Sequence, residues 1–215
     1  IGRIIVQLKA MKQYENTLIM FLSDNGASAE IMVRGDGHDP KAPLGSASTY
    51  PCLGPGWSNA CNTPFRRHKT WTHEGGSCTP FIAHWPEGIK SKGELRTDPG
   101  HVIDIVPTAF ELAGLKPTLK VEMPGQSLAS SFTKDTNKKR SLWFSHEGNN
   151  AYRYGDWKLV ISKGKKWELF NLAEDCTESN DLASSNPEKV KEMANAWNDH
   201  INEFLKVART RKGET

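Results

Sequence analysis

The segment Thr17–Gly26, with the sequence TLIMFLSDNG, ends in two side chains that can bind hard cations. Asp24 and Asn25 carry carboxylate and amide oxygens, the ligands that Ca²⁺ and Mg²⁺ prefer. They follow a mostly apolar run, Leu18–Ser23, which predicts a strand buried on both faces and therefore parallel and central. Ligands bind beyond the carboxyl ends of such strands. The alternative is a tight Asp-Asn-Gly turn without a ligand, because each of these residues favours turns.

A second candidate site lies in Thr63–Gly76, TPFRRHKTWTHEGG, which is crowded with basic and aromatic residues. Cationic side chains near a hard cation suit a tetrahedral oxyanion such as sulfate or phosphate. The charged or ionisable residues of this segment are Arg66, Arg67, His68, Lys69, His73 and Glu74. The alternative is a basic surface loop.

A third candidate is the string Ser145-His146-Glu147, which precedes Gly148 and Asn149 in a hairpin-like turn. Consecutive residues of a strand point to opposite faces, so these three cannot form a catalytic triad. The string therefore favours substrate contact over catalysis.

Helix and strand patterns alternate in the part of the chain that must position the first two candidates. Residues 1–11 have apolar residues at helical spacing, Thr79–Trp85 resembles a strand, and His101–Gly114 predicts a helix with Asp104 as its N-cap. Between these elements, Ala27–Thr63 is rich in Gly, Pro, Ser and Asn and predicts a long loop. Such a loop is either disordered or functional, and a functional loop here is expected to contribute to a substrate pocket.

The pattern changes after a polar segment, Leu115–Arg140, where we place a domain boundary. Four short strand-like runs predict an antiparallel meander. They are Ser141–Ser145, Ala151–Tyr154, Trp157–Ile161 and Trp167–Asn171. A final helix begins at Pro187, and its apolar face is expected to pack on the meander. We therefore predict an α/β domain over residues 1–130 and a small α+β subdomain over residues 131–215, with a four-stranded antiparallel sheet and a C-terminal helix.

Composition excludes several classes of protein. The net charge of the 215 residues is only +3, and acidic residues separate the basic clusters, so we expect no nucleic acid as partner. No apolar run is long enough to span a membrane, so no membrane association is expected. The four cysteines lack zinc-binding spacing, and Cys52 and Cys61 are either bridged or free. The uncapped first helix suggests that the chain was cut from a longer protein.

Several segments resemble those of the sulfatases, members of the alkaline-phosphatase-like superfamily. NTLIMFLSDNG is similar to their second metal-ligand motif, and KTWTHEGG is similar to a later motif whose lysine contacts the sulfate. Further segments resemble arylsulfatases in the same order, namely NTPFRRHK, TPFIAHWP, GHVIDIVPT, WFSHEGNNAYRYGDWKLV and WELFNLAEDCTESNDLA. The similarity extends from about residue 1 to residue 205.

The resemblance implies the C-terminal part of an alkaline-phosphatase-like α/β sandwich and the hydrolysis of sulfate esters. Asp24 and Asn25 are then calcium ligands, and Lys69 is a catalytic residue that binds the sulfate. His73 and His146 are expected to contact the substrate, a sulfated small molecule or glycan. Sulfatases of this kind are commonly exported, which implies a periplasmic or secreted protein.

The nucleophile of the family is absent. Sulfatases use a formylglycine made from the cysteine of a C-x-P-x-R motif, and none of the four cysteines stands in such a motif. The paired N-terminal aspartates of the family are missing too. We therefore expect a C-terminal portion that needs the N-terminal part of the same protein and is inactive alone.

Two other functions stay open. One is a phosphatase or phosphodiesterase of the same superfamily, although zinc-using relatives place His beside the aspartate, where this chain has Asn25. The other is a non-catalytic binding module, which is favoured if the parent protein lacks the cysteine motif.

Overall fold

The computed structural model describes residues 1–31, 39–116 and 123–212, the last three by their backbone only. The chain forms two compact units, 1–24 with 80–140 and 25–79 with 141–215. Residues 25–79 thus group with the C-terminal part of the chain, although more than sixty residues separate the two segments. The domains expected from the sequence, 1–130 and 131–215, stay a prediction.

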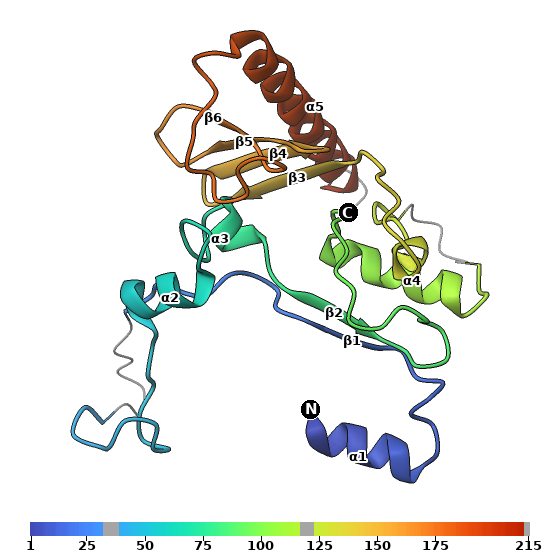
Figure 1. Ribbon diagram of the computed structural model, residues 1–215. Coiled ribbons are helices and arrows are strands. Elements are labelled where there is room, and N and C mark those ends of the chain that lie inside the picture. The colour runs from blue at the N-terminus through green and yellow to red at the C-terminus, as the bar shows by residue number, and fades with distance from the viewer. Residues whose placement is uncertain (32–38, 117–122, 213–215) are drawn as a thin grey trace. The chain divides into compact units, whose positions relative to one another are not determined.

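The first unit contains two short strands and several helices (Figure 1). Its elements are α1 (Gly2–Ala10), β1 (Ile19–Leu22), β2 (Phe81–His84), the 3₁₀ turn η1 (Val102–Asp104), α4 (Ile105–Leu112) and the 3₁₀ turn η2 (Ala129–Phe132). These bounds confirm the helix near the start, both strands and the helix after His101.

The direction expected for β1 was wrong. β1 pairs antiparallel with β2 in a two-stranded sheet, with Ile19 opposite His84, and Phe21 is 50% exposed. An uninterrupted apolar run indicates that a strand needs cover on both faces, but the segment that pairs with it decides its direction.

Asp104 precedes α4, but its side chain does not play the N-cap role expected from the sequence. The Asp104 side chain does not cap α4 but accepts a hydrogen bond from the backbone N–H of His101 at 2.7 Å, which closes a capping box around η1. It also pairs with Arg140 through two contacts of 2.5 and 3.0 Å. Asp104 therefore links the start of α4 to the end of the unit.

The second unit is built around the four-stranded sheet. Its elements are α2 (Gly54–Asn62), α3 (Glu74–Ser77), β3 (Ser141–His146), β4 (Asn149–Tyr154), β5 (Trp157–Ile161), β6 (Glu168–Asn171) and α5 (Pro187–Lys212). The strands form an antiparallel meander in chain order, and α5 begins at Pro187, both as predicted.

The long loop expected over Ala27–Thr63 is wrong in part, because α2 lies within it. Gly54, Pro55 and Gly56 suggest that no helix can form here. Pro55 nevertheless occupies the first turn of α2, where the N–H that proline lacks would have no partner within the helix. Residues 32–38 of this stretch lie outside the described residues.

The two faces of the sheet pack against different parts of the unit. One face contributes Tyr152, Leu159 and Leu169, which pack with Met193 of α5 and are surrounded by tryptophans. Figure 1 shows α5 lying along this face. The opposite face contributes Ala151, Val160 and Phe170. Adjacent residues in β5 therefore face opposite ways, which places Lys158 on the same face as Val160.

No helix in the described parts of the chain is long and apolar enough to cross a membrane. All four cysteines are exposed and none forms a disulfide in the structure, so Cys52 and Cys61 are not bridged.

Candidate functional site

The loop that carries Lys69 is wound closely around two glycines. A Cβ atom on Gly75 would meet the carbonyl oxygens of Arg66 and Arg67, and one on Gly76 would meet the carbonyl oxygen of Trp71. The Gly75 N–H donates to the Arg66 carbonyl at 3.0 Å. The Gly-Gly pair is therefore required by close backbone approach.

The same loop is joined to the segment that follows Asn25. The Lys69 N–H donates to the carbonyl of Ala27 at 3.1 Å, and the Gly26 N–H donates to the carbonyl of Gly76 at 3.0 Å. Lys69 and Asn25 are 44 residues apart in the sequence, and these hydrogen bonds hold them on neighbouring segments of backbone.

The backbone on both sides of Lys69 is strained, and a side chain of the four-stranded sheet holds it in place. Arg67 and Thr70 have φ angles of 73° and 90°, in a region that side chains disfavour, most of all β-branched ones such as that of Thr70. The buried Asn149 side chain donates to the Thr70 carbonyl at 3.2 Å. Asn149 pairs with His146 in the β3–β4 hairpin, so the hairpin end lies beside the exposed Lys69.

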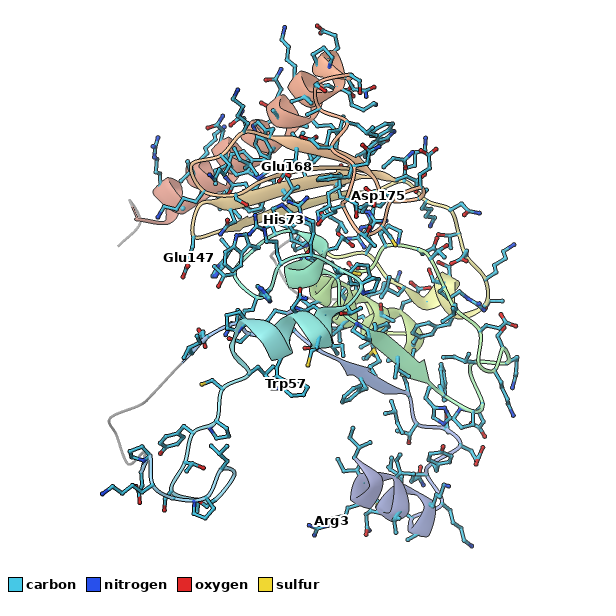
Figure 2. All side chains as sticks on the ribbon, turned by 60° about the vertical axis from the view of Figure 1, so that its left-hand side comes forward. Arg3, Trp57, His73, Glu147, Glu168 and Asp175 are labelled. Carbon is cyan, nitrogen blue, oxygen red and sulfur yellow. The ribbon has the colours of Figure 1, made fainter. Side chains whose placement is uncertain are left out.

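His146 lies at the end of β3, next to a tight two-residue turn. Glu147 and Gly148 have φ angles of 50° and 84°, the pattern of a type I′ turn. The side chains of His146 and Glu147 are 58% and 68% exposed, and Glu147 marks this turn in Figure 2. The structure thus confirms the hairpin turn and leaves His146 accessible to a substrate.

His73, in contrast, is fully buried. Its Nε2 lies 3.0 Å from a carboxylate oxygen of Glu168 on β6, and Figure 2 labels both side chains. Burial lowers the pKa of His73 to about 4, so the ring is neutral at pH 7 and Nε2 carries the proton that it donates to Glu168. This location gives His73 a structural role. Its contact with a substrate stays a prediction, which the burial does not favour.

The burial of His73 predicts a loss of stability in acid. The folded state favours the neutral ring, so its contribution is complete above pH 6.5 and is lost progressively as the pH falls from 6.5 to about 4. Between pH 7 and pH 4.5 the free energy of unfolding should fall by about 2–3 kcal/mol from this group. Urea unfolding at both pH values measures the change, and His73→Gln should reduce it. The exposed control His146→Gln should keep it, and equal pH dependence in all three proteins would contradict the assignment.

A buried ionic cluster fixes α3 to the sheet. The Lys158 ammonium, 1% exposed, lies 2.5 Å from a carboxylate oxygen of Glu74 and 2.9 Å from one of Glu178. The Glu74 N–H donates to the other Glu178 oxygen at 2.9 Å. Burial alone would raise the pKa of Glu74, but the Lys158 ammonium lowers it, whereas burial raises the pKa of Glu178. The ammonium of Lys158 thus forms ion pairs with two buried carboxylates.

A second set of contacts runs beside this cluster. Arg66 donates to the Glu178 carbonyl at 2.7 Å and to the Glu168 carboxylate at 3.1 Å, and its guanidinium lies 5.7 Å from the centre of the Phe170 ring. Lys158, Glu168 and Glu178 were not predicted from the sequence as residues of the site. A signal for Lys158 was present, because a lysine within the apolar run Trp157–Ile161 is buried with its neighbours.

The candidate cation ligands follow β1 directly, with Asp24 exposed and Asn25 half-buried. No cluster of three or more His, Cys, Asp or Glu residues that could hold a metal occurs among the described residues. The oxygen donors of Asp24 and Asn25 fit a hard cation such as Ca²⁺, but they supply only two of the six or more oxygens required. The other ligands must come from elsewhere.

Two family models match the chain. The model described as "Sulfatase" matches residues 1–115, and "N-sulphoglucosamine sulphohydrolase, C-terminal" matches residues 66–206.

The curated relatives are sulfatases. An uncharacterized sulfatase of Schizosaccharomyces pombe is 31% identical over 92% of this chain and 40% of its own length. A sulfatase of Formosa agariphila is 29% identical over 89% of this chain and 33% of its own, and the mouse N-acetylgalactosamine-6-sulfatase is 30% identical over 85% and 30%. The chain therefore spans less than half the length of these relatives.

Solved structures of similar fold also match most of this chain and less than half of their own length. Ps i-CgsB in complex with a neocarrahexaose matches 92% of this chain and 39% of its own, with a TM-score of 0.67 and 26% identity. The PsFucS1 sulfatase from Pseudoalteromonas, at 23% identity and a TM-score of 0.66, supports the fold.

Proposed function

Because this chain belongs to the sulfatase family, we propose that it is the C-terminal part of a sulfate ester hydrolase in which Lys69 binds the sulfate. The observation that carries the proposal is the hydrogen bond from the Lys69 N–H to the Ala27 carbonyl. It holds the backbone of Lys69 next to the segment that carries the oxygen ligand Asn25. An ammonium beside a cation site would match the charge of a sulfuryl group.

Asp24 and Asn25 would hold Ca²⁺ through their side-chain oxygens, with further ligands from the N-terminal part of the protein. When bound, this ion would add positive charge next to the sulfate oxygens. Lys69 would bind a sulfate oxygen and stabilise the negative charge that grows there during hydrolysis. His146 would contact the rest of the substrate from the hairpin end.

The nucleophile would also come from the N-terminal part, as a formylglycine made from the cysteine of a C-x-P-x-R motif. The chain itself contains no such motif, so alone it should hydrolyse no ester. We propose a sulfated small molecule or glycan as substrate. Two findings support a glycan: the name of the mouse relative, an N-acetylgalactosamine-6-sulfatase, and the neocarrahexaose bound to Ps i-CgsB. Export of the protein to the periplasm or the medium stays a prediction.

An assay of the full-length protein tests this function. We expect hydrolysis of an aryl sulfate in preference to the matching aryl phosphate, loss of activity after calcium is chelated, and no activity of the 215-residue chain alone. A marked preference for the phosphate ester would instead support a phosphatase or phosphodiesterase. A full-length protein without the cysteine motif and without activity on either ester would support a binding module.

A further inference from the structure

Asn62, the last residue of α2, connects the two segments that carry the proposed ligands. Its Oδ1 accepts a hydrogen bond from the Ala27 N–H at 2.8 Å, and its Nδ2 donates to the Arg67 carbonyl at 3.1 Å. The side chain is buried, with 9% of the residue exposed. Both ends of one amide are therefore used, each by a backbone group two residues from Asn25 or Lys69.

Backbone hydrogen bonds complete the link between the segments of Asn25 and Lys69. Ala27 donates its N–H to Asn62 and accepts the Lys69 N–H at its carbonyl, so both of its polar groups are fixed. The carbonyl that Asn62 binds belongs to Arg67, whose φ of 73° is in the left-handed region. Such a conformation persists only where the surroundings hold it, and Asn62 provides one of these restraints.

We propose that Asn62 is a positioning residue that sets Lys69 relative to Asn25, and this proposal rests on the function proposed above. The amide suits the role because one small side chain offers both a donor and an acceptor. Aspartate at this position would keep the acceptor for Ala27 but would place a carboxylate against the Arg67 carbonyl.

The variant Asn62→Asp in the full-length protein tests the proposal. We expect kcat/KM for a sulfate ester to fall about 10- to 100-fold, because a small displacement of a positioning group is costly. We also expect half-maximal activity to require more calcium, which a merely structural defect would not cause. In a Lys69→Ala background the same change should have almost no further effect, since Asn62 would act through Lys69. The matched control is Asn59→Asp, at an exposed position of the same helix, which should behave like the parent.

Hydrogen exchange provides a readout that does not depend on activity. In Asn62→Asp, peptides that cover residues 25–29 and 66–70 should exchange faster than in the parent, while peptides of β3–β6 should be unchanged. Unchanged exchange in the two segments would overturn the positioning role, as would a loss of activity that simply adds to that of Lys69→Ala. If the parent hydrolyses no sulfate ester, the proposed function fails, but the exchange experiment still decides whether Asn62 holds the two segments.

Discussion

Replacement of Lys69 by methionine in the full-length protein is expected to lower kcat/KM for a sulfate ester by about 100- to 1,000-fold. Methionine keeps an unbranched apolar stem of nearly the same length and removes the ammonium, with its charge and its three hydrogen-bond donors. The loss should appear mainly in kcat, because negative charge grows on the ester oxygen only as its bond to sulfur breaks in the transition state. Steady-state kinetics on an aryl sulfate gives both constants.

Two comparisons make this experiment specific. Lys165→Met removes an exposed lysine from the turn between β5 and β6 and should leave both constants unchanged. Lys69→Arg keeps the charge but changes its shape and reach, so it should recover only part of the activity. A rise in KM with an unchanged kcat would show that Lys69 only helps to bind the ground state, contrary to the role proposed here.

The largest expected effect on stability comes from Lys158. Replacement by methionine should lower the free energy of unfolding by about 3–5 kcal/mol, because it leaves the carboxylates of Glu74 and Glu178 buried without their cation. The effect is measurable by urea unfolding at pH 7. Tryptophan fluorescence reports it directly, since Trp143 and Trp197 stack at 5.7 Å in the core of the same unit.

A triple variant separates the cluster's charge from its packing. Lys158→Met combined with Glu74→Gln and Glu178→Gln removes all three charges, so it should recover much of the stability lost in the single variant. If the single variant were as stable as the parent, the cluster would contribute nothing to the fold. If the triple variant were no better than the single one, the loss would come from the hydrogen bonds of the Lys158 ammonium rather than from uncompensated charge.

The elements of the C-terminal sheet could be predicted because local signals agree there. Short apolar runs alternate with Gly-containing turns, and Pro187 marks the start of α5. The direction of β1 could not be predicted, since its pairing with β2 joins segments about sixty residues apart. The helix α2 was missed because Pro55 breaks a helix interior but is tolerated in the first turn.

The candidate site could be predicted only in part. Asp24 and Asn25 were identified by their position after a strand and Lys69 by its basic segment, and the resemblance to a known family suggested their roles. The structure holds the segments of Asn25 and Lys69 together. Their roles stay predictions. The ion pairs around them could not be predicted from the sequence. The apolar run indicates that Lys158 is buried, but its partner Glu74 is 84 residues away and looks like an ordinary surface charge on its own.

The long separation of these partners has a consequence for synthesis of the protein on the ribosome. The turn that contains His73 and Glu74 is translated 95 and 104 residues before its partners Glu168 and Glu178. Until those residues emerge, the nascent loop around Lys69 lacks the sheet that anchors it. Folding of the loop around Lys69 therefore has to wait for Glu168 and Glu178, and ribosomes that stop before these residues release a loop without its anchor.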